Sequence, residues 1–323
     1  MNNKLGVFLF TKDRPAVFGQ TLKNIMPANH RIFIIDDSLH KSNQTKNEEI
    51  TNKNGCSYLG IKAFQDFMSS YKLDPDIASF LLNRPGVPEW NLGYMRNFAL
   101  LYAKSLKLEI ILFMDDDITV TDKNLINELF GLTNLYHFTG AHISGMVDDS
   151  ILGHIATALN KPSERTLSGG FMAFCPTKVQ HYFLNFYNED WIWLFLHYAP
   201  NDSIQTGEVF QAISDPLKSY KRNGVFQEFG ERLLEAVMVS CHQGEHALLA
   251  SEDFWSSIVK ERNNYLTELR ADAARLGRHD FIMVIDFIEK KANDIDAKIL
   301  HHIFQNYFLN LRSFEQIYQS LSD

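Results

Sequence analysis

The stretch Glu109-Ile-Ile-Leu-Phe-Met-Asp-Asp-Asp-Ile-Thr119 lies about one third of the way along this 323-residue chain, and the segments on either side are interpreted from it. Its apolar run, rich in Ile and Phe, ends at three consecutive aspartates, which predicts a buried strand with carboxylates at its C-terminal end. Adjacent negative charges repel one another, so these carboxylates should be solvated or face a cation. Because successive strand residues point to opposite faces, we expect Asp115 and Asp117 to share a face that Asp116 does not. Two carboxylates spaced in this way suit a hard divalent ion.

An acidic loop that opens the next helix is the alternative interpretation of the three aspartates, and the local pattern alone does not separate the two. An EF-hand calcium loop that starts at Asp115 is excluded by two of its residues. Its sixth position is Val120 instead of glycine, and its twelfth is Ile126 instead of glutamate.

The amino-acid composition limits the classes of protein to which this chain can belong. A hydrophobic share of 45% is enough for a large core, and a net charge of -8 argues against a nucleic-acid-binding surface. The N-terminal residues lack the apolar region of a signal peptide, and no apolar run reaches the roughly 18 residues of a spanning helix, so we expect a cytoplasmic protein without a transmembrane segment. Cys56, Cys175 and Cys241 lack the spacing of a disulfide framework or a zinc site.

The N-terminal part predicts a parallel sheet. Residues 5–10 form an apolar run followed by Thr-Lys-Asp-Arg-Pro, Pro15 suits the first turn of a helix over 15–25, and a second strand over 31–35 ends in Asp36-Asp37-Ser38. Two such strands place their polar ends along one edge of a sheet, where a ligand would bind. Residues 39–54 carry no apolar period and are expected to form a surface excursion.

The remaining elements follow from periodicity and from Gly and Pro positions. We expect helices over 60–71, 91–106, 123–132 and 177–186, a loop over 74–88, and strands over 109–114, 141–146, 153–159, 166–175 and 208–214. Gly169 and Gly170 lie inside one of these strands and indicate close approach of another backbone or a ligand. Asn188 is a plausible N-cap for the next helix. From 222 onward the pattern is helical, with Gly277 as a break.

In this order the motifs resemble those of nucleotide-sugar glycosyltransferases with the GT-A fold, especially family 2. The motifs are Thr-Lys-Asp-Arg-Pro, Asp-Asp-Ser, the Gly-Tyr-Met-Arg-Asn helix, the Asp-x-Asp strand, the Gly-Gly strand and the later Glu-Asp, and they cover residues 5–214. The resemblance implies an α/β fold with a Rossmann-like, mostly parallel central sheet flanked by helices. It implies a GT-A catalytic domain over 1–222 and a helical C-terminal region over 223–323. The Gln-x-x-Arg-Trp motif of processive synthases is absent, which favours transfer of one or a few sugars.

The resemblance also implies a set of residues that bind the sugar donor. Asp37 would accept a hydrogen bond from the base, Arg14 would lie near the base or diphosphate, and Arg96 and Asn97 would lie by the ribose or phosphates. Thr11 and Asp116 complete the predicted donor site. Each has a structural alternative: a turn or cap at Asp37, and exposed surface or helix positions for the arginines and Asn97.

Metal and catalytic residues follow from the same resemblance. Asp115 and Asp117 would hold Mn²⁺ or Mg²⁺ bridging the donor phosphates, with Asp116 able to replace either of them, and His242 is a candidate extra ligand. In the Glu189-Asp190 pair, Asp190 would be the general base. The alternative for Glu189 and Asp190 is a pair of acids that complement a helix dipole, and for His242 a structural histidine.

The sequence therefore predicts a metal-dependent, inverting, non-processive glycosyltransferase of the hexosyltransferase type. Its partners would be a UDP- or GDP-linked sugar donor and a glycan, lipid-linked or small-molecule acceptor, with the C-terminal helices covering the acceptor site or mediating self-association. The alternatives are a non-catalytic module that binds sugar nucleotides or glycans, and a sugar-phosphate nucleotidylyltransferase. The latter would need an N-terminal Gly-rich phosphate loop that this chain lacks.

Overall fold

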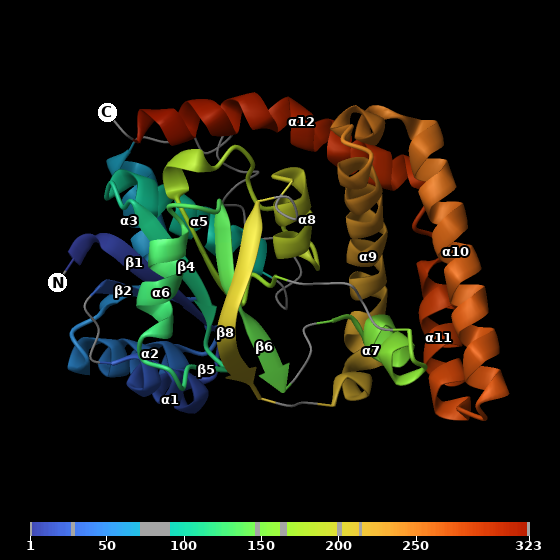
Figure 1. Ribbon diagram of the computed structural model, residues 1–323, viewed down its shortest axis with the longest axis horizontal. Coiled ribbons are helices and arrows are strands. Elements are labelled where there is room, and N and C mark those ends of the chain that lie inside the picture. Colours follow the sequence, from blue (N-terminus) through green and yellow to red (C-terminus); the bar gives the residue numbers. More distant parts are fainter. Residues whose placement is uncertain are drawn as a thin grey trace.

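Among the described residues, eight strands form one sheet, and the C-terminal helices lie to one side of it (Figure 1). The computed structural model describes residues 2–26, 30–71, 91–145, 149–161, 167–198, 202–212 and 215–321. Within these residues the strand order is β3-β2-β1-β4-β7-β6-β8-β5. The strands are β1 (Asn2–Thr11), β2 (His30–Asp36), β3 (Ser57–Leu59), β4 (Ile110–Asp115), β5 (Ile118–Thr119), β6 (Phe138–Gly145), β7 (Phe171–Phe174) and β8 (Ser203–Gln211).

The first half of the sheet is parallel and brings the predicted polar ends together. β1 pairs in parallel with β2 and with β4, so Thr11 lies opposite Asp36 and Phe10 lies opposite Asp115. β7 then runs antiparallel to both β4 and β6, while β6 and β8 are parallel. The carboxyl ends of β1, β2 and β4 thus share one edge.

Both faces of this sheet are covered, which explains why its strands read as continuous apolar runs. Alternate residues of one strand enter two separate hydrophobic clusters: Phe8 lies in one and Leu9 in the other. The helices that flank the sheet are α1 (Pro15–Ile25), α2 (Lys41–Lys53), α3 (Ile61–Ser70), α5 (Leu92–Ser105), α6 (Leu125–Leu132) and α8 (Glu189–Leu196). The short helix α7 (Ile151–Ala158) packs instead against the helices of the C-terminal third. The predicted fold class, a central sheet flanked by helices with a helical C-terminal region, is confirmed.

The C-terminal third is helical, as predicted. It comprises α9 (Tyr220–His242), α10 (Glu252–Arg275), α11 (His279–Ala292) and α12 (Ala297–Ser320). Gly277, with φ of 67°, follows the end of α10. Figure 1 shows α9, α10 and α11 packed side by side and α12 crossing back over the part of the molecule that holds the sheet.

α12 is fixed to the sheet side by specific contacts. Tyr318 donates from its hydroxyl to the carbonyl of Pro176 over 2.7 Å, and the Lys104 ammonium lies 5.0 Å from the Tyr318 ring centre. One hydrophobic cluster contains Phe113 of β4 together with Tyr307 of α12. The predicted division at 222/223 falls inside α9, across a shared core, and it stays a prediction.

Several sequence-based expectations were wrong, and each has a local cause. Residues 41–53 form α2 instead of a surface excursion, because its buried positions are polar and are satisfied by hydrogen bonds: Asn47 donates to Asp36 over 3.1 Å. Residues 151–158 are helical instead of extended, since Ser150 caps the first turn by accepting from the Gly153 amide.

The predicted helix over 177–186 reduces to the 3₁₀ turn Pro176–Lys178. The chain that follows it is held in an irregular path by Asn97, whose amide pairs with the backbone of Phe183. The predicted strand over 166–175 is shortened to β7, and the loop predicted over 74–88 lies outside the described residues. Among the helices that the structure describes, none combines the length and apolar character needed to cross a membrane.

We predict that His30 makes the protein less stable in mild acid. Its ring is buried at the start of β2, stacks edge-on against Phe130, and has no hydrogen-bond partner on either nitrogen among the described residues. Burial lowers the pKa of His30 from 6.5 to about 4. Between these values the unfolded chain takes up the proton first, so the free energy of unfolding falls as the pH falls from 6.5 to 4, by up to about 3 kcal/mol from this residue.

Urea unfolding at pH 7 and at pH 4.5 measures this contribution. The His30→Phe variant should lose less stability between the two pH values than the native chain, whereas His302→Phe, at an exposed position of α12, should not differ from it. An equal loss in all three proteins would contradict the assignment.

We predict that Glu228 is the main counter-charge for two buried arginines that join α9 to α10. Its carboxylate accepts from Arg232 Nε over 3.1 Å and from Arg262 Nη2 over 2.8 Å, and the Glu228 side chain is fully buried. The Glu228→Gln substitution removes the charge with little change in shape and should lower the free energy of unfolding by about 3–5 kcal/mol. Chemical denaturation measures this, with Asp286→Asn, which breaks only the exposed pair with Arg270, as the control. A similar small change in both variants would contradict the prediction.

Candidate active site

A cavity of about 190 Å³ opens at the carboxyl edge of β1, β2 and β4. Its polar lining comes from the loop after β1, from the end of β2, from the residue before α5 and from the end of β4: Lys12, Arg14, Asp37, Asn91 and Asp115. Thr11 also lines it, and the other described lining residues, Phe10, Leu92 and Met95, are apolar. The structure therefore brings four predicted site residues, Thr11, Arg14, Asp37 and Asp115, to one place.

The three aspartates do not continue the strand, and this changes the predicted geometry. β4 ends at Asp115, and the next two residues form a turn. Asp116 is 0% exposed. Thr11 donates to its carboxylate over 2.7 Å, Thr21 donates to its carbonyl over 2.6 Å, and Arg14 forms an ion pair with it. Asp116 thus joins the end of β4 to the loop after β1 and to α1, a structural position.

Burial raises the pKa of Asp116 to about 6, against the opposing effect of the Arg14 guanidinium. The residue does not line the cavity, so its predicted place in the donor site gains no support. Its neighbours are more exposed. Asp117 accepts from Arg14 Nη1 over 3.1 Å and from Gln211 Nε2 over 3.2 Å, whereas Asp115 faces the cavity.

Asp37 is held between two donors. Its Oδ2 accepts from the Asn91 amide over 2.9 Å and lies 3.2 Å from the Lys12 ammonium, and its backbone amide donates to the carbonyl of Thr11 over 3.0 Å. The side chain is buried at the cavity wall. The loop after β1 and the residue that precedes α5 therefore place this carboxylate jointly.

Arg96 is a buried cation surrounded by carboxylates. It lies on α5, is 2% exposed, and donates from Nη1 to Glu189 over 2.6 Å. The same guanidinium lies 3.8 Å from Asp190 and 3.9 Å from Asp115. Arg96 does not line the cavity itself, but it connects the end of β4 to the start of α8.

Glu189 and Asp190 occupy different environments although they are adjacent. Glu189 is buried, and burial raises its pKa to about 8 even though Arg96 opposes the shift. Asp190 accepts from the Gly169 amide over 2.8 Å with Oδ2 and from the Trp191 amide over 2.8 Å with Oδ1. Two backbone donors therefore set the direction of the Asp190 carboxylate.

Gly169 is the glycine that this arrangement requires. A Cβ atom there would lie 2.6 Å from Arg96 Nη1 and 2.6 Å from Asp190 Cβ. The close approach predicted for the Gly-Gly pair is present, but in the turn before β7 instead of within the strand. Any larger residue would displace the guanidinium or the carboxylate.

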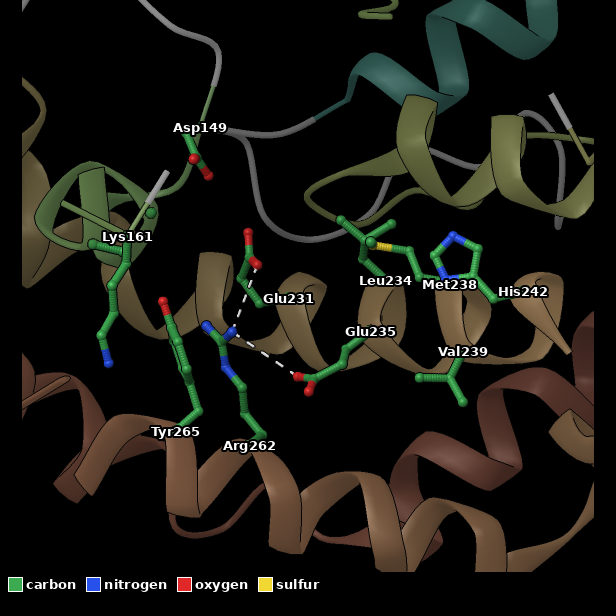
Figure 2. A pocket seen from close by; sticks show the side chains of 12 residues that line it. Asp149, Lys161, Glu231, Leu234, Glu235, Met238, Val239, His242, Arg262 and Tyr265 are labelled. Carbon is green, nitrogen blue, oxygen red and sulfur yellow. Dashed lines mark ion pairs between the residues drawn. The ribbon is translucent and has the colours of Figure 1, made fainter. Parts of the chain in front are cut away.

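Two predicted site residues lie elsewhere. Asn97 donates to the carbonyl of Phe183 over 2.9 Å and accepts from its amide over 2.8 Å, which gives it a structural position on α5. His242, at the end of α9, lines a second cavity of about 270 Å³ beside Met238 and Val239 (Figure 2). The part of the chain that the structure describes contains no group of three or more His, Cys, Asp or Glu side chains that could hold a metal ion, so His242 does not join Asp115 and Asp117.

Lys12, Asn91 and Gly169 are the site residues that sequence reasoning did not assign. Lys12 stands within the quoted motif Thr-Lys-Asp-Arg-Pro, and Asn91 is the first residue of the helix expected over 91–106, so the signal was their adjacency to assigned residues. Gly169 had been marked as a position of close approach without a partner. The partners of all three lie far away in the sequence.

No protein-family model matches the chain, and no curated protein sequence matches it. Among solved structures the chain is similar to glucosyl-3-phosphoglycerate synthase from Mycobacterium tuberculosis, a glycosyltransferase of the GT-A fold. The complex of that protein with Mn²⁺, UDP and phosphoglyceric acid aligns with a TM-score of 0.47 and 14% identity over 74% of this chain and 78% of the other. Its complex with Mn²⁺, UDP-glucose and glycerol 3-phosphate aligns with a TM-score of 0.48 and 15% identity over 74% and 80%. At these levels of similarity, conclusions on chemistry depend on the residues of this chain.

Proposed function

We propose that this chain is a glycosyltransferase that moves a sugar from a nucleoside-diphosphate donor to an acceptor hydroxyl, with inversion and one or a few sugars at a time. One observation carries the proposal: the cavity at the strand edge is lined by Asp37, Arg14 and Asp115, and Arg96 connects Asp115 to Asp190. Groups suited to a base, to phosphates and to an acceptor hydroxyl thus lie along one edge of the sheet.

The donor would lie along this edge. The Asp37 carboxylate accepts hydrogen bonds from N-H groups of a base, and the Arg14 guanidinium matches the oxygens of a phosphate. Arg14 is partly exposed and pairs with Asp117 over 3.1 Å, so it can exchange that carboxylate for a donor phosphate without breaking a buried contact. Lys12 contributes a second positive charge at the same cavity.

The two carboxylates at the end of β4 fit a divalent ion that is held jointly with the sugar donor. Asp115 and Asp117 offer hard oxygen ligands, and Mg²⁺ is commonly bound through one or two carboxylates together with substrate phosphates. The lack of a larger ligand cluster in the described residues agrees with that mode. When bound there, Mn²⁺ or Mg²⁺ would offset the charge of the departing diphosphate.

Asp190 would act as the general base. An acceptor hydroxyl is a weak nucleophile until its proton leaves, and the Asp190 carboxylate is oriented by the amides of Gly169 and Trp191 to receive it. The oxygen then attacks the anomeric carbon as the bond to the diphosphate breaks on the opposite face, which inverts the configuration. The Arg96 guanidinium lies 3.8 Å from Asp190 and links this carboxylate to the end of β4.

We predict that donor binding depends on the two metal-binding aspartates. Calorimetric titration of UDP, GDP and CDP should show one nucleotide that binds only with Mn²⁺ or Mg²⁺. Asp115→Asn and Asp117→Asn should each weaken that binding by at least about tenfold, because each removes a charged ligand of the ion. Asp66→Asn, on the exposed side of α3, serves as the matched control. Binding that ignores both metal and aspartates would remove the basis of the proposal.

We predict that Asp190→Asn retains donor binding but slows chemistry. The assay measures the rate at which nucleoside diphosphate is released from the sugar donor, with water or a panel of acceptors as the second substrate. This rate should fall by about 100-fold or more, as expected when a general base is lost. Unchanged turnover in this variant would show that Asp190 is not the base. A native chain that binds the donor and never releases nucleoside diphosphate would instead support the alternative of a non-catalytic sugar-nucleotide module.

A further inference from the structure

Asn91 belongs to the wall of the cavity at the strand edge and carries a buried acceptor. Asn91 is 3% exposed, lines that cavity, and immediately precedes α5. Its Nδ2 donates to Asp37, whereas its Oδ1 is buried and has no hydrogen-bond partner among the residues described. Buried polar atoms are nearly always paired, so an unpaired amide oxygen in a cavity wall indicates that a ligand supplies the donor.

Asp37 fixes which way the Asn91 amide points. A rotated amide would bring Oδ1 against the Asp37 carboxylate and would lose the 2.9 Å hydrogen bond from Nδ2. The orientation is therefore set by the chemistry of the pair. The unpaired atom is the oxygen, and it requires an N-H or O-H donor from the ligand.

Three side chains form an ordered pattern around this point. The Oδ2 atom of Asp37 contacts both Lys12, over 3.2 Å, and Asn91, over 2.9 Å, so the carboxylate lies between them. Lys12 can only donate, and the Asp37 carboxylate can only accept. From Lys12 through the Asp37 carboxylate to Asn91 Oδ1, the three groups are a donor, an acceptor and an acceptor.

We infer that the donor carries guanine, which is recognised by Lys12, Asp37 and Asn91; this inference rests on the proposed function and deepens it. The edge of guanine presents O6, N1-H and the N2 amino group, an order of acceptor, donor, donor that complements the three side chains. Lys12 would donate to O6, Asp37 would accept from N1-H, and Asn91 Oδ1 would accept from the N2 amino group.

The other bases do not match this order. Uracil presents two carbonyls on either side of N3-H, which would set one carbonyl oxygen against Asn91 Oδ1. Cytosine and adenine present a ring nitrogen acceptor where the Asp37 carboxylate needs a donor. Each mismatch leaves a buried acceptor facing another acceptor, and such a site rejects the wrong ligand strongly.

The size of the cavity agrees with recognition of a base instead of a whole donor. At about 190 Å³ it is smaller than the roughly 300 Å³ at the lower end of sites that enclose a complete ligand. Leu92 and Met95 supply apolar wall for the faces of a ring, while Arg14 and Asp115 line the same cavity on the way to the predicted metal-binding aspartates. The diphosphate and sugar would extend along the strand edge.

Comparison of GDP, IDP and UDP tests the inference directly. IDP carries hypoxanthine, which keeps O6 and N1-H but lacks the N2 amino group, so it isolates the contact with Asn91. In calorimetric titrations of the native chain with Mn²⁺, GDP should bind at least about tenfold more tightly than IDP, and UDP should bind more weakly than GDP.

Asn91→Ala sharpens the test, since it removes the acceptor. The GDP-to-IDP affinity ratio should fall to about one in this variant, because GDP loses a contact that IDP never makes. Asn134→Ala, at an exposed position after α6, should leave the ratio at its native value. If Asn91→Ala does not fold, the affinities of GDP, IDP and UDP for the native chain still test whether guanine is recognised.

Three outcomes overturn the inference. Binding of UDP that equals or exceeds that of GDP would exclude guanine recognition while leaving the proposed glycosyltransferase intact. Equal weakening of GDP and IDP by Asn91→Ala would reduce Asn91 to a residue that positions Asp37. Failure of every nucleoside diphosphate to bind would remove both the inference and the proposed function.

Discussion

The buried guanidinium of Arg96 is the constraint on which the rest of the site depends. A cation that is 2% exposed needs acidic partners, and the carboxyl groups of Glu189, Asp190 and Asp115 surround it from two different elements. This requirement draws the start of α8 against the end of β4. It also excludes a side chain at 169, because Gly169 lies where a Cβ atom would meet the guanidinium. The sheet edge and the helical part of the site are therefore held as one unit.

Three consecutive aspartates are tolerated because the fold separates their surroundings. The strand ends at the first of them, and the turn that follows directs Asp116 into a buried network with Thr11 and Arg14. Asp117 meets Arg14 and Gln211, whereas Asp115 faces the cavity near Arg96. One of the three is structural, and the other two stay at the edge where a donor phosphate and a metal ion would add positive charge or coordination. Hydrogen-bond and ion-pair partners therefore reduce the repulsion among the three carboxylates, in addition to any effect of solvent.

Two cavities among the described residues differ in character. The cavity at the strand edge is lined by charged and polar side chains, Lys12, Arg14, Asp37, Asn91 and Asp115, and the proposed transfer chemistry rests on them. The larger cavity among α7, α9 and α10 is lined by side chains such as Glu231, Glu235 and Arg262, and Arg262 is held by Glu228 as part of the packing between two helices (Figure 2). The C-terminal helices share a hydrophobic core with the sheet through α12, so they belong to the same folded body.

The sequence alone determined the strands β1, β2 and β4 and the helices α10 to α12, because continuous apolar runs and 3.6-residue periodicity are local signals. It also placed Arg14, Asp37 and Asp115 at strand ends, which parallel pairing then brought to one edge. Only the tertiary structure decided that α2 is a helix, that Asn97 binds the backbone of Phe183, that Asp116 is buried against Thr11, that His242 lines another cavity, and that Asn91 lines the cavity at the strand edge. Each of these depends on polar contacts between residues distant in sequence, such as Asn91 with Asp37, and local hydrophobic patterns carry no information about such pairs.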